Sequence, residues 1–124
     1  MKGCRSLLFA VLLSTACAVA AAAQQQITPA EAANHIGQVA TVCGKIASLH
    51  WATSSKGQPT FINLDKPYPQ QIFTVLIWGS DRPQFGDVEQ KFAGKTICVT
   101  GSVSAFRGVP EIVAQSATEI RVQR

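Results

Sequence analysis

The chain has 124 residues, of which 47% are hydrophobic and 15% are charged, and it carries a formal net charge of +4. This length suits one domain with a single hydrophobic core. The mild charge argues against the strong electrostatic footprint of a highly basic nucleic-acid-binding protein, and the sequence has no glycine-rich phosphate loop.

Residues 1–23 are predicted to be a cleaved export signal. They begin with Lys2 and Arg5, continue with an apolar run over residues 7–19, and end in three alanines before Gln24, which is the pattern of such signals. A membrane anchor is the alternative, but the apolar run is short and passes into alanine and glutamine. We therefore expect a periplasmic or secreted protein.

Cleavage would leave 101 of the 124 residues, with nine basic and seven acidic side chains and a net charge of about +2. Residues 14–17 weakly resemble a lipoprotein cleavage box, with serine at the position where leucine is usual. Lipidation of Cys17 is therefore kept as a minor alternative.

Loss of the signal leaves Cys43 and Cys98 as the cysteines of the exported chain. An even pair in an exported protein favours a disulfide, and each cysteine lies on the strand face opposite to the alternating small and apolar residues. Closing this span of about 55 residues would stabilise the fold by roughly 4 kcal/mol in the chain-entropy model. Two free thiols are the alternative, and no histidine pair at ligand spacing points to zinc.

The N-terminal segment 24–36 is predicted to be a polar tail followed by a short helix over residues 29–36. Thr28 and Glu31 match a capping box, and a proline stands at the first helical position. Gly37 is expected to end the helix. The three glutamines that precede it are expected to be disordered.

Five strands are predicted in the remaining domain, residues 37–124. Turn residues fill the loop 52–59, and two prolines exclude a strand interior from residues 65–71. One short, irregular helix is predicted over residues 82–93. The strands cover residues 38–51, 60–64, 72–78, 96–106 and 111–115, and residues 120–122 either extend the last strand or add a small one.

Glycines in the middle of the first and fourth predicted strands, Gly44 and Gly101, indicate strands that bend sharply, as in a small closed barrel. The element order predicts an all-β fold with short helices, a five-stranded Greek-key OB-fold barrel with a short helix between strands 3 and 4. In that barrel the first strand pairs with the fourth, which brings the two cysteines onto one surface. Another small barrel, such as an SH3-like one, explains this helix less well.

Four segments, residues 42–46, 60–69, 73–78 and 107–112, resemble bacterial exported OB-fold proteins of the nucleic-acid-binding superfamily. They read VCGKI, TFINLDKPYP, FTVLIW and RGVPEI. The resemblance covers roughly residues 36–122, and it implies the OB fold, export and a nucleic-acid-binding role. It brings no catalytic residue.

No catalytic constellation is visible in the sequence, so neither an enzyme nor a cofactor or metal site is expected. His35 and His50 lie far apart in the chain and in no recognised motif. Glu111 is interpreted as a strand-edge charge or a turn contact with Arg107 rather than as a general base.

An OB-fold binds its ligand on the face of strands 2 and 3, between the loops that follow strands 1 and 4. Single-stranded nucleic acid needs aromatic platforms, each stacked base contributing ~1–3 kcal/mol, and a positive track. Trp51 is the preferred platform, whereas Phe61 is equally explained by the core and Trp78 by a plug at the barrel end. Lys56 and Arg107 are expected at one rim. The candidate ligand-binding residues are Lys45, His50, Trp51, Lys56, Phe61, Asn63, Tyr68, Trp78 and Arg107.

Two functions stay open on this evidence. The first is an exported module that binds single-stranded nucleic acid non-specifically through a rim of aromatic and basic residues. The alternative is a cell-envelope module that binds a protein or a glycan without enzymatic activity, which the weak net charge and the export signal favour.

Overall fold

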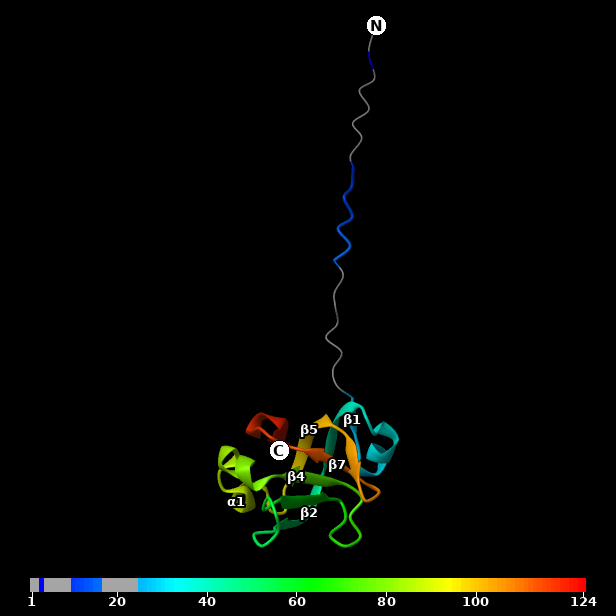
Figure 1. Ribbon diagram of the computed structural model, residues 1–124. Helices are drawn as coiled ribbons and strands as arrows, with labels where there is room; N and C mark the ends of the chain where they lie inside the picture. The colour runs from blue at the N-terminus through cyan, green and yellow to red at the C-terminus, as the bar shows by residue number, and fades with distance from the viewer. Residues whose placement is uncertain (1–2, 4–9, 17–24) are drawn as a thin grey trace.

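The computed structural model describes residues 3, 10–16 and 25–124 (Figure 1). Most of the predicted signal, the cleavage site before Gln24 and Cys17 lie outside the described residues. No helix in the described part of the chain is long and apolar enough to cross a membrane. The domain consists mainly of β-strands with short helical segments, as the sequence predicts.

The described residues form eight strands, three 3-10 helices and one α-helix. Figure 1 shows η1, in cyan, and α1 at opposite ends of the domain. In chain order the elements are β1 (Gln26–Ile27), η1 (Pro29–His35), β2 (Val39–Trp51), β3 (Thr60–Leu64), β4 (Thr74–Ile77), η2 (Gly79–Phe85), α1 (Val88–Phe92), β5 (Thr96–Ser102), β6 (Ser104–Phe106), β7 (Val109–Val113), η3 (Ala117–Glu119) and β8 (Ile120–Val122).

The strands are hydrogen-bonded in the order β6-β7-β4-β3-β2-β5-β8, and β1 pairs in parallel with β2. The β4–β7 pair is also parallel, and the other pairs are antiparallel. The path runs from β6 to β8 without closing on itself, so its hydrogen bonds do not define the closed five-stranded barrel that was predicted. The predicted strand 96–106 is broken at Val103 into β5 and β6, and residues 120–122 form a separate strand on β5.

The N-terminal helix has the predicted capping box, but it is a 3-10 helix. The Thr28 hydroxyl accepts a hydrogen bond from the Glu31 N–H, and the Glu31 carboxylate accepts one from the Thr28 N–H. The expectation of a disordered tail is wrong for Gln26, which lies in β1 and pairs with Thr41 of β2. The physical reason is its neighbour Ile27, whose side chain is buried in the core and fixes this segment.

The predicted pairing of the first and fourth strands is present as β2 against β5. Cys43 and Cys98 are direct partners in this register and form a disulfide. Glycine is required on both strands by close packing: a Cβ on Gly44 would lie 2.7 Å from Cγ of Pro29. A Cβ on Gly101 would lie 2.7 Å from Cγ2 of Ile112.

A β-bulge in β2 changes which side chains face the core. The register with β3 shifts between Ile46 and Ser48, and such a shift reverses the alternation of the strand. Ala40 and Ile46 are buried before the bulge, whereas Leu49 packs against the core after it. Ser48 therefore does not continue the inward-facing row of Ala40 and Ile46.

One core fills the space between the strands and the helices. The helical segment predicted over residues 82–93 is present as η2 and α1, separated at Gly86, where φ is +71°. These two elements cover one end of the core with apolar side chains. The largest fully buried side chains are those of Phe73, Phe85, Ile62, Leu64, Ile77, Ile97 and Ile112.

The last hairpin has a two-residue turn with a positive φ at both positions, +50° at Arg107 and +80° at Gly108. Phe106 and Val109 are partners across this turn. Positive φ at both central residues is the geometry that matches the twist of a hairpin. The strand after the turn therefore begins at Val109, two residues before the predicted start at Glu111.

Candidate functional site

A groove of about 580 Å³ lies on the outer face of β3, β4 and β7. Its floor comes from these strands and the end of β2, and its rim from the loops around residues 52–59, 65–73 and 106–109. The lining residues are Ser48, His50, Ala52, Ser55, Phe61, Asn63, Tyr68, Gln71, Thr74, Phe106, Arg107, Val109 and Glu111.

Strand alternation builds this floor. Ile62, Val75 and Ile112 are partners across β3, β4 and β7, and all three point into the core with no exposed surface. Their neighbours in each strand must then point outward. One outward row across the sheet is polar, and the next is aromatic and apolar. The polar row is Ser48, Asn63, Thr74 and Glu111, and the second is His50, Phe61, Leu76 and Val113.

The polar row is ordered by hydrogen bonds. The Thr74 hydroxyl donates to Oδ1 of Asn63 over 2.7 Å, and Nδ2 of Asn63 donates to Oγ of Ser48 over 3.0 Å. Oγ of Ser48 also accepts the backbone N–H of Tyr68 over 3.2 Å, which ties the proline-containing loop to the groove. Asn63 is only 3% exposed, and both ends of its amide are hydrogen-bonded within the protein, so little of this side chain is left to contact a ligand.

Glu111 ends the polar row on the opposite side from Ser48. Among the described residues, no hydrogen bond or ion pair with its carboxylate is present. Burial in the groove raises the pKa of this carboxyl above its ordinary value because the charged form loses hydration. A second acceptor without a partner in the described structure, the buried Oε1 of Gln71, belongs to the same groove.

Aromatic rings flank the floor. Tyr68 is 72% exposed and Phe106 is 57% exposed, which is unusual for side chains of this size. The guanidinium carbon of Arg107 lies 5.2 Å from the centroid of the Phe106 ring, a cation–π contact. Arg107 is the one lysine or arginine among the described residues that line the groove.

Five of the nine predicted ligand-binding residues come together here, and four do not. The groove contains His50, Phe61, Asn63, Tyr68 and Arg107. Phe61 lies in the groove and not in the core, and it is only partly buried. The other four, Lys45, Trp51, Lys56 and Trp78, are not among its lining residues.

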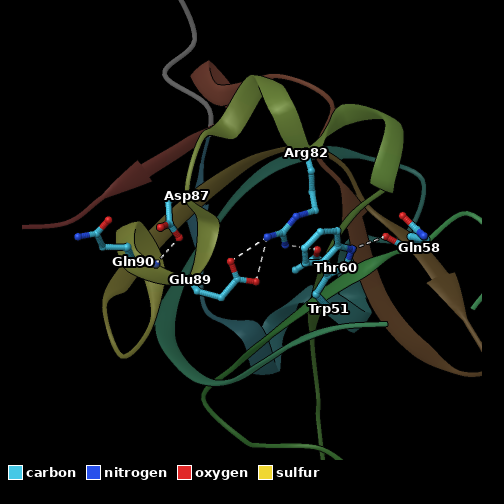
Figure 2. Close-up of polar contacts among 7 residues, drawn as sticks. All are labelled: Trp51, Gln58, Thr60, Arg82, Asp87, Glu89 and Gln90. Carbon is cyan, nitrogen blue, oxygen red and sulfur yellow. Dashed lines mark hydrogen bonds and ion pairs between the residues drawn. The ribbon is translucent and has the colours of Figure 1, made fainter. Parts of the chain in front are cut away.

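Trp51 was predicted to be a stacking platform for a ligand, but in the structure its ring contacts Arg82. Figure 2 shows its indole against the guanidinium of Arg82, whose central carbon lies 3.8 Å from the ring centroid. The indole N–H donates to the Gln58 carbonyl over 3.1 Å. Trp51 alternates with His50 along β2 and pairs with the buried Thr60, so it faces away from the groove.

Arg82 connects η2 to the sheet and to α1. Its Nη1 donates to the Thr60 hydroxyl over 2.7 Å, and its Nη2 donates to both carboxylate oxygens of Glu89 (Figure 2). Hydrogen bonding from Arg82 lowers the pKa of Glu89. In the same view Asp87 caps α1 by accepting the Gln90 N–H. These contacts hold elements of the scaffold together.

The remaining three predicted residues have separate places. The backbone N–H of Lys45 donates to the Asp65 carboxylate, and its side chain is exposed. The Trp78 ring lies against Gly57, where an added Cβ would meet it at 3.0 Å. Lys56 is exposed in the loop beside that glycine.

Sequence reasoning missed several lining residues, above all Phe106, Glu111, Gln71, Ser48 and Thr74. Phe106 and Glu111 could have been found, because they alternate with inward residues on either side of a recognised turn. Ser48 could not, because the bulge that turns it outward has no clear mark in the sequence. No cluster of three or more His, Cys, Asp or Glu side chains that could hold a metal ion occurs within residues 3, 10–16 and 25–124.

Comparison with known proteins supports the fold. No protein-family model matches the sequence, and no curated protein matches it. Among solved structures, the chain is similar to the S. pombe Stn1–Ten1 complex, with a TM-score of 0.51 and 21% identity over 69% of this chain and 58% of that one. A protein from Leishmania major Friedlin described as an aspartyl-tRNA synthetase gives a TM-score of 0.53 and 10% identity over 85% of this chain and 22% of that one. The aspartyl-tRNA synthetase of Entamoeba histolytica gives 0.50 and 19% over 80% and 21%.

The chain thus spans 58% of the first structure and about a fifth of the synthetases. At these identities the likeness shows an OB-like fold and carries no function with it.

Proposed function

We propose that the chain is an exported OB-fold module that binds single-stranded nucleic acid in the groove, without reading a defined sequence. In this proposal β2, β3, β4, β5 with β6, and β7 are the five barrel strands, and η2 with α1 is the connecting helix. The antiparallel β2–β5 pair, the parallel β4–β7 pair and the direct passage from β5 into β6 support that assignment.

Four ring-bearing side chains around one groove carry the proposal. His50 and Phe61 belong to the floor, and Tyr68 and Phe106 stand exposed at the rim. Exposed rings along an open groove provide stacking surfaces for bases, and every base has a face that can stack. Arg107 beside Phe106 is placed to meet a phosphate, which would make binding weaken as salt rises.

The position of the groove also supports the proposal. The groove lies between the β2–β3 loop and the β6–β7 turn, on the face of the sheet that OB-folds use to bind oligonucleotides.

Export is supported by the composition of residues 1–23 and by the Cys43–Cys98 disulfide, because disulfides persist in oxidising compartments. A periplasmic or secreted location follows in the proposal.

The alternative is a cell-envelope module that binds a glycan or a protein. It is favoured by the Glu111 carboxylate in the floor and by the single arginine in the lining, which together give the groove little positive charge. OB-folds also bind oligosaccharides on this face.

The test is fluorescence anisotropy of a labelled, mixed-sequence DNA strand, titrated with the exported, disulfide-bonded protein. We expect binding at low salt that weakens between about 50 and 200 mM salt. The double variant Tyr68→Ala, Phe106→Ala should bind at least ~30-fold more weakly, since each lost stacking contact is worth ~1–3 kcal/mol. Trp78→Ala, an exposed aromatic outside the groove, is the matched control and should bind like the unaltered protein.

Failure of the folded protein to bind at low salt would reject the nucleic-acid proposal. Binding of oligosaccharides measured by isothermal titration calorimetry, and lost in the same double variant, would then support the alternative.

A further inference from the structure

We propose that the groove prefers bases that carry an exocyclic amino group, and therefore cytosine over thymine among the pyrimidines, because Glu111 presents an unpartnered acceptor to the ligand. This inference rests on the proposed function and gives the module a chemical preference that stacking alone does not provide.

The direction of the hydrogen bonds in the polar row carries the argument. The Thr74 hydroxyl donates to Asn63, and the Asn63 amide donates to Ser48. Every proton placed by these two bonds thus points away from Glu111, although Thr74 and Glu111 are direct partners in the register of β4 and β7. The end of the row offers acceptor atoms and no donor from within it.

The surroundings of Glu111 do not supply the missing donor. Its strand partner on the other side is Ser104, whose hydroxyl is directed to the backbone carbonyl of Glu111 over 3.5 Å and not to its carboxylate. Within the described part of the chain no cation lies within ion-pair distance of this carboxylate. Oε1 of Gln71 adds a second acceptor in the same groove that is buried without a partner.

Glu111 is partly buried, so a bound base would remove water from its carboxylate, and a donor on the base would replace that hydration. The cytosine amino group at N4 is a donor, and the thymine O4 at the same place is an acceptor. A cytosine amino group would satisfy Glu111. Thymine in the same position would bring two acceptors together, and its N3–H donor would reach the carboxylate only if the base shifted along the groove. Base edges then face the floor, and the phosphates stay near Arg107 at the rim.

The experiment compares the affinity of the exported, disulfide-bonded protein for oligo-dC, oligo-5-methyl-dC and oligo-dT of equal length near neutral pH. The methylated cytosine and thymine share the methyl group and differ at C4, where an amino group replaces a keto group, and at N3, where an acceptor replaces an N–H donor. We expect both cytosine strands to bind about fivefold or more tightly than oligo-dT, which is the lower range of discrimination by a good base contact.

Glu111→Gln supplies the second arm, since its amide can donate to O4 of thymine as well as accept from an amino group. The ratio of the two affinities should fall to within about twofold of one, chiefly through tighter oligo-dT binding. Asp81→Asn removes the same charge from η2, outside the groove lining, and should change both affinities by the same factor and leave the ratio unchanged.

Equal affinity of the unaltered protein for oligo-5-methyl-dC and oligo-dT would overturn the inference while leaving the proposed function in place. An unchanged ratio in folded Glu111→Gln would overturn the role of Glu111 in the same way. Absence of binding to all strands would overturn both proposals.

Discussion

Replacing Trp51 with alanine should destabilise the fold and leave the groove able to bind. The change removes a cation–π contact between Arg82, whose side chain is 11% exposed, and Trp51, which is 39% exposed, so the contact is worth about 1 to 2 kcal/mol, between the exposed and the desolvated values. It also removes the indole hydrogen bond to Gln58, worth about 1 kcal/mol. Together the expected loss in the free energy of unfolding is about 2 to 3 kcal/mol.

Urea denaturation followed by circular dichroism measures this loss, and thermal unfolding should show a fall in Tm on the order of 10 °C. Trp51→Phe is the matched control, because it keeps a ring over Arg82 and loses the indole N–H. A double-mutant cycle with Arg82→Met isolates the pairwise term, which should be about 1 to 2 kcal/mol.

Trp51 belongs to the scaffold and Tyr68 to the groove, so stability and binding should separate. Trp51→Ala, measured under conditions in which it is folded, should bind a single-stranded oligonucleotide like the unaltered protein. Unchanged stability together with a large loss of binding in Trp51→Ala would refute this assignment and restore the interpretation that the sequence suggested.

Two further predictions concern stability. The double variant Cys43→Ala, Cys98→Ala should lose roughly 4 kcal/mol of unfolding free energy, the chain-entropy value for a sequence separation of 55, as measured by urea denaturation. The unaltered protein in reductant should have the same stability as this variant. Equal urea midpoints for the variant and the oxidised protein would contradict the prediction. Glu111→Gln should gain stability relative to the unaltered protein as pH rises through the raised pKa of Glu111. Above that pH the partly buried carboxylate is charged in the folded state, and below the ordinary pKa near 4.5 it is neutral in both states. A stability difference between the two proteins that stays constant from acid to neutral pH would show that burial does not act on this group.

Much of the local structure follows from the sequence because its causes are local. The capping box at Thr28 and Glu31 and the turn at Arg107 and Gly108 depend on residues a few positions apart. Strand alternation placed Cys43 and Cys98 on one face, and the structure confirms the disulfide. Other elements depend on contacts between residues far apart in the sequence. Gln26 was expected to be disordered, but its neighbour Ile27 is buried in the core, and the two residues form β1 against β2.

The candidate site was predicted in part for the same reason. His50 was identified from its place at the end of the first predicted strand and Phe61 from its place on the second, and both line the groove. Trp51 was assigned to the same surface because it is adjacent to His50, but adjacent residues of a strand face opposite ways and Arg82, 31 positions along the chain, lies against the ring of Trp51.

The sequence by itself determined the strand-rich class, the turns and the pairing of the cysteines, since these depend on residue type and short spacing. Only the tertiary structure decided which side of β2 faces the groove, because one bulge between Ile46 and Ser48 reverses every side chain after it. The same register brings Ser48, Asn63, Thr74 and Glu111 into one row from four strands, a placement that depends on pairing between distant segments and not on any local pattern.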